Sequence, residues 1–400
     1  MNKESILFLT KDAMCKDYLP LYGNKYWKGQ TPNIDELAAK GTVYNNFFTA
    51  APSSAMSYLS MFTRKYPYQQ GIKKYVHVEH KYEGRTLFDD AFDLGYDCHI
   101  IWDATWKQLA YDYTQCYGDN TTIHWLSEIK QAVGSHYPHE KRLERNKEKE
   151  EAAFNKVKNE LKEISKTENK VFLWCHLPHV LNGRRSFCDD IDLFDRYIGM
   201  FREFFGDDYI FISADHGNMN GMRGKIEYGF DVYDKSISIP FISPRINNLK
   251  SCRQQISNIH VFELIFKRQI VETPITYSDC AYYLQPQRKL AVIYGKWRYI
   301  YNKYDRTEEL YDIEWDPHQD FNLMSDFIYD IDRHKTAMSC DNYFYPYWDD
   351  LPQIREKLRK AKDEIWREEE GFQRFVAEMQ KKPFGKFVKK IGSIIYHLFK

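Results

Sequence analysis

Hydrophobic residues along the chain fall into short β-rich runs separated by longer amphipathic stretches. This alternation is typical of a sheet that helices cover on both faces. The runs predicted to be strands are Ile6–Thr10, Val43–Phe48, Cys98–Trp102, Val171–Cys175, Tyr209–Ser213 and Ile239–Ile242. The pattern therefore predicts an α/β fold for most of the chain.

Two stretches between these runs have the features of helices. Residues Pro32–Ala39 are predicted to form a short helix, with Thr31 as the N-cap and a proline at the first helical position. The charged stretch from Glu140 to Lys166 has apolar residues at helical spacing, namely Phe154, Val157, Leu161 and Ile164. It is predicted to be a solvated surface helix with one apolar face.

The pattern changes after about residue 285. Residues Leu290–Tyr294 and Trp297–Tyr301 are β-rich and are joined through Gly295 and Lys296, which predicts a hairpin in a small antiparallel subdomain. From Leu351 onward the chain is helical and charged. We therefore predict a large α/β domain over 1–285, a small β subdomain over 286–345 and a helical tail over 346–400.

The end of the tail, residues 381–400, is predicted to be a basic amphipathic helix. Lysines cluster around an apolar helical face made of Phe384, Phe387, Val388, Ile391, Ile394, Ile395 and Leu398. Such a helix binds anionic lipid with roughly 1 kcal/mol per nearby cation, in addition to apolar burial. It can equally dock on the core of its own protein. The first interpretation predicts peripheral membrane contact and a lipid-linked substrate.

Composition narrows the class of protein. A chain of 400 residues with 43% hydrophobic residues can bury a large core. Lys and Arg total 57 and Asp and Glu total 57, so no overall charge attracts nucleic acid, and no nucleic-acid partner is expected. The eight cysteines form no CxxC pair, and no apolar run is long enough for a membrane span or a signal peptide. We expect a cytoplasmic protein, at the inner face of the membrane if the tail binds lipid.

Candidate chemistry lies where two predicted strands end. Asp12 follows the run ILFLTK, and Asp215 and His216 follow the run YIFIS. Open α/β sheets bind their ligands at the carboxyl edge, which makes these side chains candidate metal ligands. An N-cap aspartate beside a surface histidine would give the same Asp-His pattern. Small and hydroxyl residues around Ser54 precede a further helical stretch, whose N-terminus suits an anion.

These segments resemble the sulfatase family of the alkaline-phosphatase superfamily. The stretch TPNIDELAAKGTVYNNFFTAAPSSAMSYLSMFTRKYP is similar to the family's N-terminal signature. Further blocks follow the family's order over most of residues 5–323: ILFLTKDAMCKDYLPLYGN, HLPHV, ISADHGN with YDKSISIPFI, and GKWRYIYNKYDRTEELYDIEWDPHQDFNL. The resemblance implies an alkaline-phosphatase-like mixed sheet sandwiched by helices, with the catalytic domain at 1–285.

The resemblance also implies residue roles. Ser54 falls at the position of the nucleophile, and His179 at that of a histidine that contacts the transferred group or protonates the leaving oxygen. His176 and Lys225 are predicted to contact the substrate. The predicted metal ligands are Asp12, Ser54, Asp215, His216 and Asn218. Each has a structural alternative: a helix cap for the aspartates and Ser54, and a buried core histidine for His179.

The ligand set suits one divalent ion of Mn, Zn, Mg or Ca. A second ion would need further ligands near His176, Asp190 or Asp195, and the sequence assigns no such set.

The sequence also departs from the sulfatase pattern. Sulfatases convert a cysteine or serine to formylglycine within C/S-x-P/A-x-R, whereas this chain has Met56 and Tyr58 at the last two defined positions. The family's Lys-x-His motif after Cys98–Trp102 is replaced by Asp103-Ala104-Thr105. An unmodified serine resembles the phosphatase and phosphotransferase branches instead.

We therefore predict a hydrolase or transferase acting on a phosphate ester or phosphodiester through a covalent Ser54 intermediate. The alternatives are a sulfatase and an inactive module that binds an anionic glycan. The expected substrate is a phosphorylated or sulfated saccharide or a lipid-linked compound.

Overall fold

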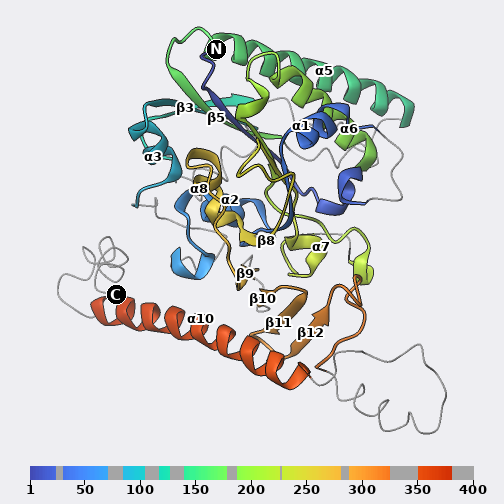
Figure 1. Cartoon of the computed structure of the whole chain (residues 1–400), viewed down its shortest axis with the longest axis vertical. Coiled ribbons are helices and arrows are strands. Elements are labelled where there is room, and N and C mark those ends of the chain that lie inside the picture. The colour runs from blue at the N-terminus through green and yellow to red at the C-terminus, as the bar shows by residue number, and fades with distance from the viewer. Residues whose placement is uncertain are drawn as a thin grey trace.

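A mixed eight-stranded sheet in the order β4-β3-β5-β1-β6-β7-β2-β8 forms the centre of the large domain in the computed structural model (Figure 1). The structure describes residues 1–23, 30–70, 84–103, 117–126, 139–177, 187–225, 228–280, 288–324 and 350–380. The strands are β1 (Ile6–Lys11), β2 (Thr42–Phe48), β3 (Tyr96–Asp103), β4 (Thr121–Leu126), β5 (Lys170–Leu177), β6 (Ile210–Ala214), β7 (Phe241–Ser243) and β8 (Ser251–Ser257). β7 is antiparallel to both of its neighbours, β6 and β2.

Every strand predicted from an apolar run is present, with one notable shift. The run Ile239–Ile242 was expected to be a strand, whereas β7 begins at Phe241. Pro240 explains the difference, because proline has no N–H to donate to a neighbouring strand. The strands that the apolar pattern did not predict, β4 and β8, are the two edges of the sheet. Their sequences TTIHWL and SCRQQIS are largely polar, as suits a partly solvated edge.

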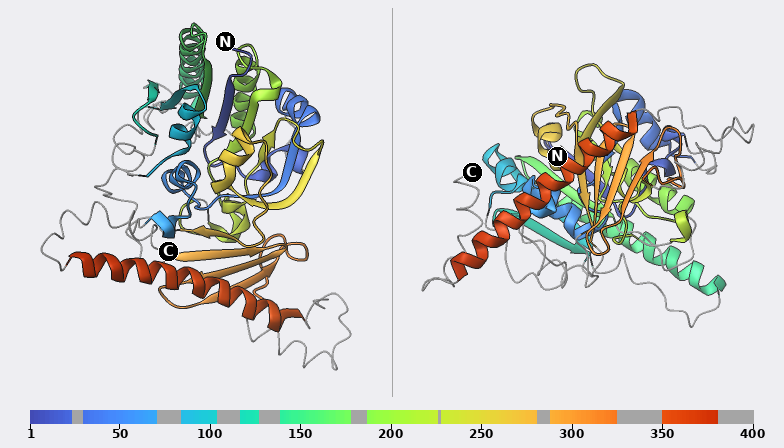
Figure 2. Two further views of the ribbon diagram at one scale, coloured as in Figure 1. Left: turned by 60° about the vertical axis from the view of Figure 1, so that its left-hand side comes forward. Right: turned by 90° about the horizontal axis from the view of Figure 1, so that it is seen from below.

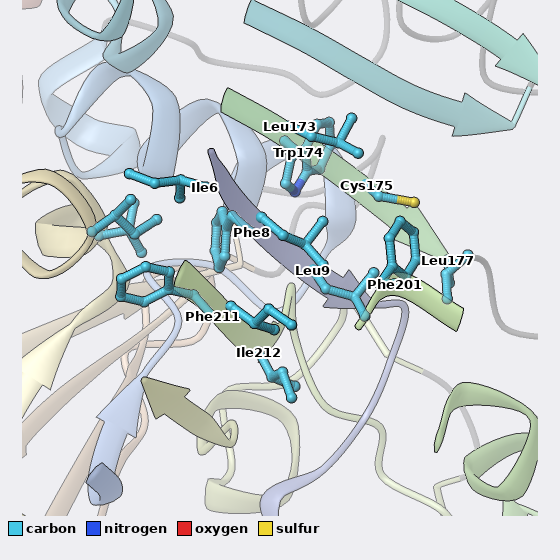
Figure 3. Packing of buried hydrophobic residues seen from close by; sticks show 14 of the residues in the cluster. Ile6, Phe8, Leu9, Leu173, Trp174, Cys175, Leu177, Phe201, Phe211 and Ile212 are labelled. Carbon is cyan, nitrogen blue, oxygen red and sulfur yellow. The ribbon is translucent and has the colours of Figure 1, made fainter. Parts of the chain in front are cut away.

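Helices cover both faces of this sheet. On one side lie α1 (Pro32–Lys40), α5 (His139–Ile164) and α6 (Phe187–Phe201), and on the other lie α2 (Ser54–Thr63), α3 (Leu87–Asp93) and α8 (Val261–Phe266) (Figure 1). Strand β5 shows the alternation: the Trp174 ring lies 5.0 Å from the Tyr58 ring of α2. Phe201 of α6 lies on the other face, beside Leu9 and Leu177 (Figure 3). The predicted α/β architecture is confirmed.

Strand β1 lies in the middle of the core, between β5 and β6, and is parallel to both (Figure 3). All of its residues are buried, which explains why ILFLTK reads as a continuous apolar run. Because β1 and β6 are parallel neighbours, the polar residues that follow them emerge next to each other at the carboxyl ends of the strands.

The N-terminus of α1 differs from its prediction in one respect. Thr31 is the N-cap residue, but its side chain makes no capping hydrogen bond to the helix backbone. Asp195 of α6 accepts hydrogen bonds from the backbone N–H of Ile34 (2.8 Å) and of Asn33 (3.3 Å) instead. The long helix α5 is confirmed, with Val157 and Leu161 fully buried.

A second, antiparallel sheet has the order β12-β11-β10-β9. It consists of β9 (Thr276–Asp279), β10 (Lys289–Tyr294), β11 (Trp297–Asn302) and β12 (Glu308–Asp312). The predicted hairpin is confirmed: Tyr294 pairs with Trp297, and Gly295 has a φ of +55°. Strand β9 belongs to this sheet although it precedes residue 285; the domain division at that residue stays a prediction.

Helix α10 (Leu351–Gln380) packs along the outer side of the small sheet, as Figure 2 shows. Its buried residues, Leu351, Leu358, Ala361, Ile365 and Trp366, join the apolar cluster of that sheet. No helix among the described residues is long and apolar enough to cross a bilayer. Residues 381–400, the predicted amphipathic basic helix, lie outside the described residues, so their membrane contact stays a prediction.

Candidate metal and nucleophile site

Adjacent strand ends bring two aspartates and a histidine together. β1 and β6 are parallel neighbours with Lys11 opposite Ala214, so the next residues, Asp12 and Asp215, emerge side by side. The backbone N–H of Ala13 donates to Asp215 Oδ1 at 3.0 Å. One ligand atom each from Asp12, Asp215 and His216 lies within 4.8 Å of the others, and all three residues are buried. The meeting of these side chains follows directly from the sheet topology.

The hydrogen bonds of His216 determine which of its nitrogens is available. Its Nδ1 lies 2.7 Å from the carbonyl oxygen of Gly217. A carbonyl only accepts, so Nδ1 carries the proton, and in a neutral ring Nε2 keeps its lone pair. That Nε2 lies 3.7 Å from Asp12 Oδ1 and 3.5 Å from Asp215 Oδ2. A backbone carbonyl thus orients the imidazole as a metal ligand.

Ser54 completes this cluster. It is the first residue of α2 and only 2% exposed, and its Oγ lies 3.0 Å from His216 Nε2. The Nε2 lone pair that accepts this hydrogen bond is also the one that a cation would use. One turn along the helix, the Ser57 hydroxyl donates to the backbone carbonyl of Asp215 at 2.6 Å. Asn258 Nδ2 donates to Ser57 Oγ at 3.0 Å and holds this turn in place.

Asp215 has nearly all of its acceptor sites filled. Its Oδ1 accepts from the backbone N–H of Ala13 (3.0 Å) and of His216 (2.8 Å). Its Oδ2 accepts from the Tyr58 hydroxyl at 2.9 Å. Burial first, and then the nearby charges of Asp215 and Asp12, raise the pKa of the Tyr58 phenol well above its usual value. Tyr58 therefore remains a hydrogen-bond donor to this carboxylate.

The donor set fits a divalent cation. Two carboxylates, one imidazole nitrogen with a lone pair directed at them and one hydroxyl are the oxygen and nitrogen donors used for Mn, Mg, Ca and Zn. Imidazole mildly favours Mn or Zn among these. Within the residues that the structure describes, this is the one group of three or more His, Cys, Asp or Glu side chains that could hold an ion.

The residues considered for a second ion serve other contacts. Asp190 forms a buried ion pair with Lys11 at 2.8 Å. Asp195 caps α1, as described above. His176 is fully buried, with Nδ1 3.0 Å from Thr10 Oγ1 and Nε2 2.6 Å from Tyr58 Oη. The described residues therefore add no ligand set around these positions.

The remaining predicted site residues are Asn218, Lys225 and His179, and the structure describes only the first two of them. Asn218 is 2% exposed, and its amide oxygen accepts from the backbone N–H of Asn220 at 3.1 Å. Lys225 forms an ion pair with Asp231 and is partly exposed. His179 lies outside the described residues. Metal binding by Asn218, substrate contact by His176 and Lys225, and the role of His179 all stay predictions.

Several residues of the site were not predicted from the sequence. Ser57 and Tyr58 lie three and four positions after Ser54 and so share its side of α2, a spacing that could have identified them. Asn258 comes from a segment 201 positions from Ser57, and Tyr228, which follows His216 in the sequence, folds back so that the two rings lie 4.4 Å apart. Neither carries a local signal, because only the tertiary fold brings it to the site.

Comparison with known proteins places this geometry in context. The family model named Sulfatase matches residues 5–267. The chain is 26% identical over 284 residues to an ulvan-active sulfatase of Formosa agariphila, an alignment that covers 65% of this chain and 52% of that protein. The chain thus spans about half the length of this curated relative.

Two solved structures illustrate the shared fold. A 2-O glycosaminoglycan sulfatase superposes with a TM-score of 0.62 at 14% identity, covering 88% of this chain and 94% of that one. The phosphonate monoester hydrolase of Agrobacterium radiobacter superposes with a TM-score of 0.58 at 12% identity, covering 88% and 96%. At these identities the likeness shows the fold alone.

Proposed function

This chain belongs to the sulfatase family, and we propose that it is a metal-dependent hydrolase that removes sulfate from an anionic saccharide, with Ser54 as the nucleophile. The observation that carries the proposal is the position of Ser54 Oγ, 3.0 Å from His216 Nε2, the nitrogen that also faces Asp12 and Asp215. The curated relative is described as active on ulvan, and one structural neighbour as acting on glycosaminoglycans. These names support a sulfated glycan as the substrate class.

The family membership changes the order of the predicted functions. The departures from the formylglycine motif placed phosphate esters first and sulfate esters second. The family match and the curated relative both favour sulfate. Hydrolysis is accordingly preferred to transfer, and the lipid-linked substrate and cytoplasmic location remain proposals that no observed contact supports.

The reaction uses the chain's residues as follows. When bound, a divalent cation lowers the pKa of the serine hydroxyl and offsets the charge on the ester oxygens. Ser54 Oγ gives up its hydroxyl proton to solvent and attacks sulfur, the sulfur–alkoxy bond breaks, and the released alcohol takes up a proton, for which His179 is the predicted donor. Water then attacks the sulfated serine, releasing sulfate and a proton and restoring the hydroxyl. The N-terminus of α2 directs its first N–H groups toward the anion.

A second candidate, phosphate-ester chemistry, is favoured by the residues around the nucleophile. Met56 and Tyr58 stand where the motif C/S-x-P/A-x-R requires proline or alanine and arginine. A serine that is not converted to formylglycine can attack phosphorus in the same geometry and form a phosphoserine. The mass of the peptide containing Ser54 tests conversion directly.

Activity assays on the purified full chain test the proposal. Sulfated oligosaccharides, an aryl sulfate and a nitrophenyl phosphodiester would each be supplied with Mn, Zn, Mg or Ca in turn. We expect metal-dependent release of sulfate, and a loss of at least about a thousandfold in kcat/KM for Ser54→Ala. Ser60→Ala is the matched control, because it removes another buried hydroxyl of α2 and should retain activity.

Each result decides between the candidates. Equal turnover by Ser54→Ala would remove Ser54 from the mechanism. Preferential cleavage of the phosphodiester would replace sulfate chemistry by the second candidate. Binding of a sulfated oligosaccharide without turnover under any metal would favour the inactive glycan-binding module.

A further inference from the structure

A continuous line of hydrogen-bonded side chains runs behind the ligand Asp215. The Trp174 indole Nε1 lies 3.0 Å from Thr10 Oγ1, and Thr10 Oγ1 lies 3.0 Å from His176 Nδ1. His176 Nε2 lies 2.6 Å from Tyr58 Oη, which lies 2.9 Å from Asp215 Oδ2. All five residues have an exposed fraction of 0%. The line joins β5, β1 and α2 to the end of β6.

With Asp215 ionised and His176 neutral, one set of donors and acceptors satisfies the whole line. An ionised carboxylate only accepts, so Tyr58 gives its single proton to Asp215. Tyr58 Oη must then accept from His176 Nε2–H. In the neutral ring this leaves Nδ1 as an acceptor for the Thr10 hydroxyl, and Thr10 Oγ1 accepts from the Trp174 N–H, which can only donate. Every proton thus points toward Asp215.

This line determines which part of Asp215 is available to an ion. A carboxylate has about four acceptor sites. Two backbone N–H groups occupy Oδ1, and Tyr58 occupies one site on Oδ2. The remaining site belongs to Oδ2, which lies 3.5 Å from His216 Nε2. The carboxylate is therefore prepared to bind through one oxygen on the side of His216.

From this geometry we infer that Tyr58 is a positioning residue for the metal, holding Asp215 Oδ2 in place through the line Trp174–Thr10–His176–Tyr58. The inference rests on the metal site of the proposed function. The inference also explains one departure from the motif C/S-x-P/A-x-R, because Tyr58 stands where the motif has arginine. A phenol supplies a hydrogen bond there without placing a positive charge beside a cation.

The competing explanation is that Tyr58 only fills the core. Its ring makes edge contacts with Trp102 (5.5 Å) and Trp174 (5.0 Å) and stacks on Phe62 (6.1 Å). Tyr58→Phe keeps these ring contacts and removes the hydroxyl alone. It therefore separates positioning of Asp215 from packing.

Metal affinity, measured by titration calorimetry with Mn²⁺ on the full chain, is the readout. We expect Tyr58→Phe to weaken Mn²⁺ binding about tenfold, because loss of an outer hydrogen-bond partner typically costs 10- to 100-fold. Thr10→Val should weaken it about threefold, on the order of half that free-energy effect. The double variant should bind no more weakly than Tyr58→Phe, since both changes act through one line. Tyr44→Phe removes an equally buried phenol, bonded to Ser243 Oγ at 3.2 Å, and should leave affinity unchanged.

The results distinguish this inference from the proposed function. Unchanged Mn²⁺ affinity in a folded Tyr58→Phe variant would overturn the inference while leaving metal-dependent hydrolysis intact. Additive losses in the double variant would also overturn it, because separate effects would then be at work. If Tyr58→Phe does not fold by circular dichroism, Thr10→Val alone decides, and wild-type affinity there counts against the inference. A wild-type chain that binds no divalent ion would remove the proposed site together with the inference.

Discussion

The absence of a side chain at Gly217 allows the segment Asp215–Gly217 to pack closely against the backbone of Lys235 and Ser236. The Gly217 N–H donates to the carbonyl of Ser236 at 2.8 Å. A methyl group at position 217 would lie 2.0 Å from the backbone oxygen of Lys235, closer than side chains come in real structures. The neighbouring Gly217 carbonyl also orients His216. Any shift of this segment therefore moves a ligand.

We predict that Gly217→Ala lowers both stability and metal affinity. Overpacking against backbone typically costs 1–3 kcal/mol, so the free energy of unfolding in urea should fall by about that amount. Gly206→Ala is the matched control, because its added methyl group would meet only Tyr209 Cδ2, at 3.7 Å. If Gly217→Ala and the control have the same free energy of unfolding, the backbone at Lys235 can move aside without destabilising the protein, which contradicts the prediction.

Some residues of the site can be predicted from the sequence, and others cannot. Asp12, Asp215 and His216 follow buried strands, and a polar residue after an apolar run is visible in the sequence itself. The donors that hold them are harder to identify: helical spacing from Ser54 indicates that Tyr58 is on the side of the site, but it does not indicate which residue Tyr58 binds. Tyr58 and Asp215 are 157 positions apart in the sequence. In the sequence, Tyr58 cannot be distinguished from an aromatic residue that only packs on the apolar face of a helix. Only the crossing of α2 over β1 and β6 gives it a partner.

The N-terminus of helix α1 is capped by a side chain of another helix, Asp195 of α6. Sequence pattern correctly placed Thr31 at the N-cap, but its hydroxyl donates to Asp35 Oδ1 at 3.2 Å instead of accepting from the backbone. Asp195 of α6 accepts from the N–H groups of Asn33 and Ile34 and from the Asn33 side chain at 2.9 Å. Local pattern could not reveal this cap, because the acceptor lies 161 positions from Ile34.

Replacing Asp195 by alanine should therefore destabilise the protein more than replacing Thr31. Loss of a capping side chain costs about 0.5–2 kcal/mol, and Asp195 is buried, so we expect about 2 kcal/mol for Asp195→Ala. Thr31→Val nearly keeps the side-chain volume and removes one hydrogen bond, to Asp35, so it should cost only about 0.5–1 kcal/mol. Thermal and urea unfolding of both variants provide the measurement. A larger loss of stability in Thr31→Val than in Asp195→Ala would show that Thr31, and not Asp195, caps the helix.

At the scale of the whole molecule, the two sheets are joined by a buried glutamine. Gln255 lies on β8, at the edge of the large sheet, and is 7% exposed. Its Nε2 lies 2.9 Å from Thr276 Oγ1 of β9 and 3.0 Å from the carbonyl of Ile293 on β10. Its Oε1 accepts from the N–H of Gly295 at 2.9 Å. One side chain thus contacts two strands and the hairpin turn of the small sheet.

Gln255→Leu should loosen the small sheet without disturbing the metal ligands. Leucine has a similar size but leaves the buried Ile293 carbonyl without this partner, and a buried unsatisfied group costs about 1–3 kcal/mol. The Gly295 N–H also loses its partner, although it lies at an exposed turn where water can replace the glutamine. We expect amide hydrogen exchange to accelerate across β10 and β11 while β1 and β6 keep wild-type protection, because among the described residues the Gln255 side chain makes no hydrogen bond with the ends of β1 and β6 or with α2, which hold the metal ligands. Gln254→Leu, on the exposed side of the same strand, should leave exchange unchanged. Faster exchange throughout both sheets would mean instead that they unfold as one cooperative unit.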